Sequence, residues 1–203
     1  MGEKLKTKEL ILAIATEVFH NKGYTGARMQ EIADLAKVNK AALHYYFSSK
    51  QQLFEVILLN SFKNLFISFE NLAVKELPIF DKIDFLIDEY SAFVKKNIQI
   101  IKFILSEVDK NLPLIQTNIK MISLENSFIG KMYNEFDREM KLGNIKTTNP
   151  RHLLTNIISM CIFPFIAKPV IMEINKFSTD EINAFLDERE KYIKQFVHNA
   201  LKI

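Results

Sequence analysis

Polar and aromatic side chains are predicted to share one face of a short helix that begins near Lys40. The segment from Met29 to Phe47, MQEIADLAKVNKAALHYYF, holds two short apolar patterns separated by Lys37-Val38-Asn39. In the second pattern Leu43 and Phe47 lie four residues apart, so both point inward. The residues that then fall on the opposite face are Lys40, Ala41, His44 and Tyr45. A basic and aromatic helix face with small neighbours is suited to contact with a DNA duplex.

The first pattern predicts the helix that must support this face. Its small apolar residues follow helical spacing and can lie against a neighbouring helix; they are Met29, Ile32, Ala33 and Ala36. The linker is long enough only for a tight turn, with Val38 as an apolar plug and Asn39 as the N-cap of the next helix. Two short helices joined in this way form a helix-turn-helix.

The distribution of charge agrees with DNA binding. The net charge of the 203-residue chain is only +3. Residues 1–50 hold eight Lys or Arg and five Asp or Glu, whereas residues 51–203 hold nineteen of each. The whole cationic excess therefore lies in the helix-turn-helix region.

This region resembles the N-terminal domain of the TetR family of bacterial transcriptional regulators. The resemblance covers about the first quarter of the chain and is carried by Ala15, Phe19, Gly23-Tyr24, Ile32-Ala33, Ala36, Val38, Leu43, Tyr45, Phe47, Ser49-Lys50 and Leu53-Phe54. The chain departs from the family pattern at Ala27-Arg28, Lys37, Ala41 and His44. The resemblance implies a homodimeric repressor that binds a palindromic operator and is released by a small molecule.

The resemblance also implies roles for individual residues. Contacts inside the DNA groove are expected from Lys40, Ala41, Ala42, His44 and Tyr45. Contacts to backbone phosphate are expected from Arg28, Tyr46 and Lys50.

Helical periodicity continues along the rest of the chain, with no alternating strand pattern. We therefore predict an all-α protein of about nine helices, with a helix-turn-helix domain at 1–50 and a helical ligand-binding and dimerisation domain at 51–203. The expected helices cover Lys8–Asn21, the two of the helix-turn-helix, one from a Ser49–Gln52 capping box, Asp81–Lys96, Ile98–Asp109, Leu112–Met140, an eighth from Asn149-Pro150 and a ninth from a Ser178–Glu181 capping box. Gly23 and Gly143 are expected to end the helices before them.

The run Leu153–Met172 has the length of a membrane span. Its polar residues and two prolines, Pro164 and Pro169, argue against a span and predict a kink in a helix buried between elements or subunits. The ninth helix has its own apolar face: Ile182, Phe185, Leu186, Ile193, Phe196, Val197 and Ala200. We expect the eighth and ninth helices to form the homodimer interface and no membrane contact.

A ligand cavity is a further expectation. The chain has seventeen phenylalanines and seven methionines, most of which must fill the core, and a few polar residues interrupt the apolar faces. Such cavities are mostly apolar with a few orienting polar groups. The expected lining residues are Phe66, Phe103, Asn126, Tyr133, Ser159 and Phe163. The ligand should then be hydrophobic or amphipathic.

Other classes of function have no support in the sequence. We find no metal-binding motif, no glycine-rich phosphate loop and no nucleophile–base set, so we expect no metal, no cofactor and no enzymatic activity. Cys161 lies in an apolar stretch and is expected to be a small buried residue. With no signal peptide, a cytoplasmic location is expected. The alternative to a ligand-controlled regulator is a ligand-independent DNA-binding structural or adaptor protein.

Overall fold

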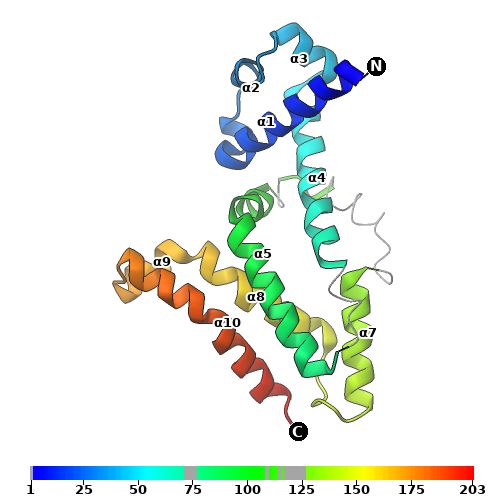
Figure 1. Cartoon of the computed structure of the whole chain (residues 1–203), viewed down its shortest axis with the longest axis vertical. Helices are drawn as coiled ribbons and strands as arrows, with labels where there is room; N and C mark the ends of the chain where they lie inside the picture. The colour runs from blue at the N-terminus through cyan, green and yellow to red at the C-terminus, as the bar shows by residue number, and fades with distance from the viewer. Residues whose placement is uncertain (1, 71–76, 108–109, 114–115, 117–126) are drawn as a thin grey trace. The chain divides into compact units, whose positions relative to one another are not determined.

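The computed structural model describes residues 2–70, 77–107, 110–113, 116 and 127–203. Within these ranges the chain forms nine α-helices and no strand, which confirms the all-α prediction (Figure 1). The chain divides into two compact units, one of Met1–Leu65 with Gln99–Met121 and the other of Phe66–Ile98 with Ile122–Ile203.

The first unit has an apolar core. It contains α1 (Gly2–Gly26), α2 (Met29–Leu35), α3 (Lys40–Tyr46), most of α4 (Lys50–Glu70) and the last turns of α5 (Ile79–Glu107). The Phe54 ring lies at the centre of this core, with its centroid 5.6 Å from that of Phe19, 4.8 Å from Tyr24 and 5.9 Å from Phe103. Aromatic side chains from α1, α4 and α5 therefore hold the unit together.

Gly23 interrupts α1 as predicted, but not as a left-handed cap. Its backbone has φ +64° and ψ −178°, a combination that only glycine adopts readily. The chain bends here and then returns to a turn that ends at Gly26, so α1 is longer at both ends than the expected Lys8–Asn21.

The predicted capping box at the start of α4 is half correct. The Gln52 amide donates to Ser49 Oγ at 3.1 Å, as predicted. The Gln52 side chain, however, accepts from the Ser48 amide at 2.8 Å and not from that of Ser49. Because the linker between α3 and α4 is short, the Ser48 amide lies within reach of the side-chain carbonyl oxygen of Gln52.

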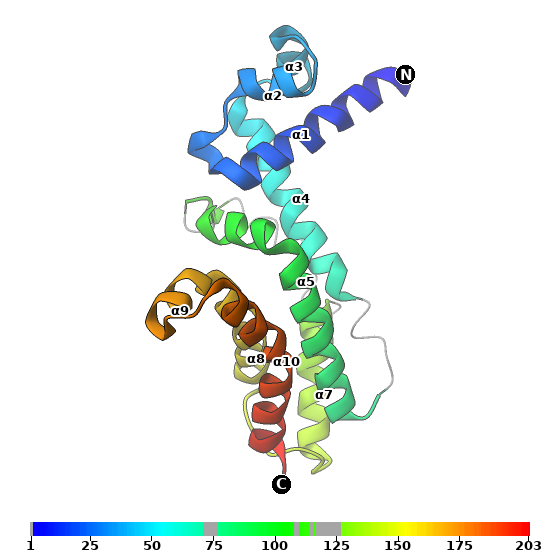
Figure 2. The same ribbon diagram turned by 60° about the vertical axis from the view of Figure 1, so that its left-hand side comes forward.

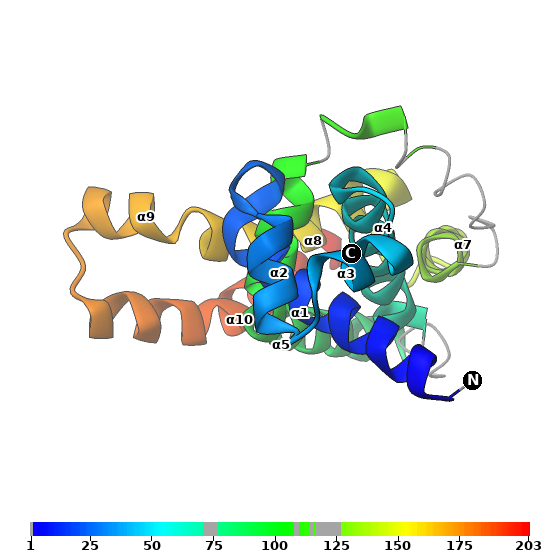
Figure 3. The same ribbon diagram turned by 90° about the horizontal axis from the view of Figure 1, so that it is seen from above.

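The second unit is a helical bundle (Figure 2). It contains the first part of α5 with α7 (Phe128–Lys141), α8 (Pro150–Ile166), α9 (Lys168–Asn175) and α10 (Thr179–Leu201). Buried apolar residues from α5, α7, α8 and α10 form its core, among them Ile83, Ile87, Val94, Met132, Phe136, Leu154, Ile157, Ile182, Ile193 and Val197. Helix α9 contacts α8 and α10, and with the start of α10 it forms a hairpin (Figure 3).

Ion pairs join the helices of this bundle. Lys82 of α5 pairs with Glu135 of α7 at 2.9 Å. Helices α5 and α10 are joined by the ion pairs Asp88–Lys194 at 2.6 Å, Lys95–Glu190 at 3.1 Å and Lys95–Asp187 at 3.3 Å, and by a hydrogen bond between His198 Nε2 and Asp84 Oδ1 at 2.7 Å. These contacts fix how α5 lies along α10.

The boundary predicted between helices at 81–96 and 98–109 is confirmed, because α5 consists of two helical segments that meet at a kink at Asn97 (φ −119°, ψ 22°). Two predicted helix starts in this part of the chain are wrong. Asp81 lies in the first turn of α5 and does not cap it, because the Lys82 amide already donates to the Pro78 carbonyl. The long helix expected from Leu112 does not reach α7 unbroken. Ser127 is extended and its Oγ accepts from the Gly130 amide at 3.3 Å, so α7 begins at Phe128.

The other helix ends follow the sequence signals. Asn149 and Pro150 begin α8, Gly143 ends α7 with φ +74°, and Ser178 and Glu181 form both hydrogen bonds of a capping box. The apolar run breaks near its prolines, since α8 and α9 meet at 71° around Ala167. In the described part of the chain no single helix is long and apolar enough to span a membrane, although the bent pair α8–α9 together meets that test on length and composition.

Candidate nucleic-acid interface

The turn between α2 and α3 is fixed by its own backbone and by one cap. Asn39 Oδ1 accepts a hydrogen bond from the Ala42 amide at 2.7 Å, which confirms Asn39 as the N-cap of α3. Lys37 has φ +54°, a left-handed conformation that glycine adopts at less cost. The turn is therefore the same tight turn that glycine would make, built here with a lysine.

Helix α3 presents the face that its spacing predicts. Leu43 and Phe47 are buried, while the residues on the opposite side are exposed: Lys40, Ala41, His44 and Tyr45. Ala42 lies between these two faces and is half-buried. The small side chains at positions 41 and 42 leave the backbone of α3 open to close approach by another molecule.

His44 is oriented by the chain that follows α3. Its Nδ1 lies 3.3 Å from the Ser48 carbonyl oxygen. When Nδ1 carries the proton and donates to that oxygen, Nε2 is left as a hydrogen-bond acceptor. A neutral His44 would then accept from an amino group, and a protonated one could donate to phosphate.

The expected phosphate-binding residues surround α3. Arg28 is the exposed residue directly before α2 and makes no side-chain cap. Tyr46 is half-buried and meets the Tyr45 ring edge-on, with 5.2 Å between centroids. Lys50 begins α4, and its Nζ lies 4.6 Å from the centroid of the Tyr24 ring. All three residues belong to the same compact unit as α3.

One cation near α3 was not anticipated from the sequence. Lys8 of α1 is exposed, and its Nζ lies 5.9 Å from the centroid of the Phe47 ring, where α3 ends. The two residues are 39 positions apart, so no local spacing could have associated them. Only the tertiary structure, which brings Lys8 to the residue that caps α3, reveals this contact.

The residues expected to line a ligand cavity belong to both units of the chain. Phe103 is buried in the core of the first unit, while Tyr133 is half-buried on α7 of the second. Ser159 and Phe163 are exposed, because α8 buries the opposite side through Leu154, Ile157 and Cys161. Asn126 lies outside the described residues, and for Phe66 only the backbone is described.

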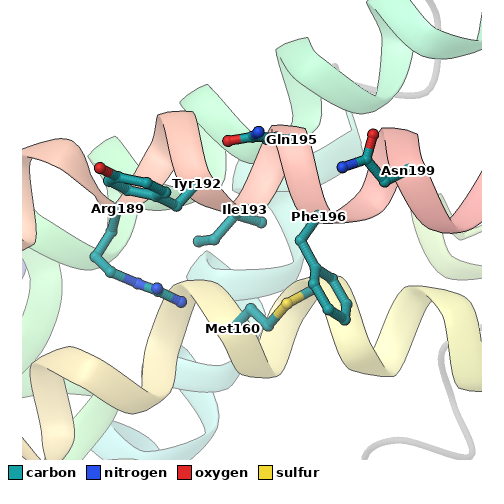
Figure 4. A pocket seen from close by; sticks show the side chains of 7 residues that line it. All are labelled: Met160, Arg189, Tyr192, Ile193, Gln195, Phe196 and Asn199. Carbon is teal, nitrogen blue, oxygen red and sulfur yellow. The ribbon is translucent and has the colours of Figure 1, made fainter.

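Two of the hollows lined by described residues of the second unit are large enough to consider as ligand sites. One, of about 620 Å³, is lined by α7 and the start of α8 and includes Tyr133, Asn134 and Arg151. The other, of about 360 Å³, runs between α8 and α10 and includes Met160, Tyr192 and Phe196 (Figure 4). Figure 4 shows the Phe196 ring and the Met160 side chain pointing toward one another across this groove.

Cys161 is a buried structural residue. Burial raises the pKa of its thiol to about 11, so the thiol stays protonated near neutral pH. Among the described residues no group of three His, Cys, Asp or Glu is placed to hold a metal ion.

Comparison with known proteins agrees with this geometry. Residues 11–57 match the family model described as bacterial regulatory proteins, tetR family. The chain is 37% identical over 70 residues to the HTH-type transcriptional repressor NicS of Pseudomonas putida, a match that spans 34% of this chain and 31% of that repressor. It is 21% identical to the probable HTH-type transcriptional regulator YttP of Bacillus subtilis over 98% of this chain and 92% of that protein.

The fold of the whole chain also has solved counterparts. AibR, in a crystal structure with isovaleryl coenzyme A and operator DNA, superposes with a TM-score of 0.65 at 17% identity and covers 95% of this chain and 97% of its own. The relatives are named as regulators of transcription and not as enzymes. Over residues 11–57 the chain is therefore similar to the tetR family of bacterial regulatory proteins, and over its whole length it resembles a probable transcriptional regulator in sequence and solved proteins of this type in fold.

Proposed function

We propose that the protein is a homodimeric repressor that binds a palindromic operator and leaves it when a small hydrophobic ligand binds. The observation that carries the proposal is the exposed face of α3, where Lys40, His44 and Tyr45 project from a helix whose other side is buried. The relative NicS, which is named as a repressor, supports the direction of regulation.

The proposed contacts divide into two kinds. Lys40, Ala41, Ala42, His44 and Tyr45 enter the major groove and select the sequence. Arg28, Tyr46 and Lys50 bind phosphate and hold α3 in register. Under this assignment His44→Ala changes which operator is preferred, whereas Lys50→Ala weakens binding to all sequences by a similar factor.

Footprinting of the purified protein on the DNA upstream of its own gene tests the operator proposal. A protected inverted repeat whose half-sites are about 34 Å apart is expected from two recognition helices on one face of the duplex. Binding that does not depend on salt, or that survives alanine at both Lys40 and Lys50, would contradict it.

The proposed dimer interface is a face of α8 and α10 whose exposed residues are mostly uncharged, with Arg189 at one end of its groove. The exposed residues along this face are Asn156, Ser159 and Phe163 of α8 with Tyr192, Gln195, Phe196 and Asn199 of α10. Phe196 is 64% exposed and Phe163 is 62% exposed. The cores of protein interfaces are poor in charged residues and rich in aromatic residues. The exposed Phe196 ring and the groove beside it also give this face both a protrusion and a hollow, and a two-fold interface needs such a self-complementary surface.

Charge introduced into this face tests the dimer. Phe196→Glu is expected to give a folded monomer that no longer binds the operator, as measured by light scattering and DNA titration. Phe185, on the same helix, is the control because it is half-buried against Phe177 of its own chain, with ring centroids 5.8 Å apart. Phe185→Leu should leave the dimer intact. A monomer at micromolar concentration for the unmodified chain would overturn the interface.

The proposed ligand is a small, largely hydrophobic molecule bound in the second unit. The operator complex of AibR contains isovaleryl coenzyme A, and another protein of similar fold is named as a regulator of fatty acid metabolism. Tyr133 lines the larger of the two hollows, next to Asn134 and Arg151. An acyl compound with a polar end would find there an aromatic ring for its acyl chain and polar side chains for its polar end. A tenfold loss of operator affinity requires about 1.4 kcal/mol of coupling.

A panel of acyl compounds of increasing chain length tests this proposal. Binding should raise the melting temperature and release the operator, and Tyr133→Ala should reduce both effects while operator affinity without ligand stays unchanged. If no compound has either effect, the ligand-independent adaptor becomes the better description.

A further inference from the structure

We propose that Lys8 of α1 is a further DNA-binding residue, which contacts a backbone phosphate beside the end of the recognition helix α3. This inference rests on the proposed operator binding through α3 and adds a contact from a different helix. The first turns of α1 would thereby form part of the DNA-binding surface.

The position of Lys8 is defined by α3. Its Nζ lies 5.9 Å from the centroid of the Phe47 ring, and Phe47 is the C-cap of α3. Phe47 is buried, so its ring is fixed in the core, and the ammonium group of Lys8 lies over this ring.

The dimensions of α3 match the groove that it would enter. Helix α3 has seven residues and is therefore about 10 Å long, whereas the major groove is about 12 Å wide. Lys40 is the first residue of α3, and Lys8 lies at its other end. Cations at both ends of such a helix are spaced to meet the phosphates of the two strands that border the groove.

Lys8 is free to bind an anion. Its side chain is exposed, and within the described residues no carboxylate pairs with it. Lys22, on the same helix, differs in this respect because its Nζ lies 2.5 Å from Glu31 Oε1 of α2. The ammonium of Lys8 is therefore available to phosphate, while that of Lys22 is already neutralised.

The salt dependence of operator binding tests the assignment. Each phosphate contact contributes about 0.9 to the slope of log affinity against log salt concentration. Lys8→Met keeps an unbranched side chain over Phe47 but removes the charge, so it should lower this slope by about one and weaken binding roughly fivefold at 0.15 M salt. The operator and a duplex with altered half-sites should lose affinity by the same factor, because phosphate contacts carry no sequence information.

Two further variants make the test specific. Lys8→Arg keeps the charge and should restore the slope, and Lys22→Met is the matched control that should leave the slope unchanged. Equal melting temperatures for Lys8→Met and the unmodified chain would show that the loss is not a folding defect.

The outcomes separate this inference from the proposed function. If the unmodified chain binds its operator and Lys8→Met has the same slope, Lys8 does not contact phosphate and operator binding through α3 still stands. A loss confined to the operator would also overturn the assignment, because Lys8 would then contact bases. If the unmodified chain shows no salt-dependent binding, the proposed function itself fails.

Discussion

The helices within each of the two units are joined to one another by different kinds of interaction. In the first unit, helices α1, α4 and α5 meet through tilted and edge-on aromatic rings around Phe54. In the second unit, α5 is joined to α7 and α10 by ion pairs over and above the apolar core.

This difference determines which charges are available to a partner. Lys8, Arg28 and Lys40 of the first unit are exposed on the surface, where phosphate can meet them. In the second unit several Lys, Asp and Glu side chains already pair with one another. The DNA-binding unit and the helical bundle thus use the same residue types in opposite ways.

The largest expected effect comes from removing the aromatic centre of the first unit. Phe54→Ala should lower the free energy of unfolding by about 3–5 kcal/mol, because a fully buried ring is replaced by a cavity. Denaturant titration followed by circular dichroism measures the loss. Leu35→Ala is the control, since Leu35 is exposed and should change the free energy by less than about 0.5 kcal/mol. A small effect at Phe54 would mean that the unit does not depend on its aromatic core.

Breaking an ion pair of the second unit should cost slightly less, and the two partners should differ. Glu135→Leu leaves the Lys82 ammonium, which is only 7% exposed, without its carboxylate, and should cost about 3 kcal/mol. Lys82→Met should cost about 1 kcal/mol, because Arg138 still lies 2.9 Å from Glu135. Denaturant titrations of the two variants measure the difference. Equal losses would show that Arg138 does not stabilise the remaining carboxylate.

The helix caps should contribute equally in both units. Asn39→Ala removes the acceptor for the Ala42 amide, and Ser178→Ala removes the acceptor for the Glu181 amide. Each change should cost about 1 kcal/mol of unfolding free energy. Thermal unfolding measures both, with the exposed Ser159→Ala as the control. A much larger loss for either variant would indicate a role beyond capping.

The smallest effect concerns pH and one histidine of the first unit. Burial lowers the pKa of His20 below its ordinary value of 6.5, and its Nε2 lies 3.1 Å from Ser61 Oγ. The His20 side chain therefore binds a proton more tightly in the unfolded chain than in the folded chain. The contribution of His20 to stability should be complete above pH 6.5 and should decrease as the pH falls from 6.5 toward the folded-state pKa.

Denaturant midpoints measured between pH 5 and pH 8 test this expectation. His20→Gln should flatten the pH dependence, whereas the exposed His152→Gln should leave it unchanged. A profile that His20→Gln does not alter would contradict the assignment.

Local spacing was sufficient to predict most of the first unit. The Asn39 cap, the buried Leu43 and Phe47 and the exposed face of α3 all depend on residues fewer than ten positions apart. The proximity of Lys8 to Phe47 could not be predicted in this way, because it depends on how α1 packs across the other helices.

The second unit was harder to predict, because apolar spacing does not fix where a helix begins or which side it buries. The pattern from Ile115 to Met140 is continuous in sequence, yet Ser127 is extended and begins a new helix. The capping signals at Asn149 and Ser178, which act over three residues, were confirmed. Phe163 illustrates the remaining difficulty, since an apolar residue in an apolar run lies on the exposed side of α8.

The ion pairs between α5 and α10 also exclude other alignments of these two antiparallel helices. If α10 slid by one turn in one direction, Asp88 would lie opposite Glu190 in place of Lys194. If it slid by one turn in the other direction, Lys95 would lie opposite Lys191 in place of the acidic residues at 187 and 190. Either slip brings like charges together. In the observed alignment Asp88 lies beside the oppositely charged Lys194, and Lys95 lies beside the oppositely charged Asp187 and Glu190.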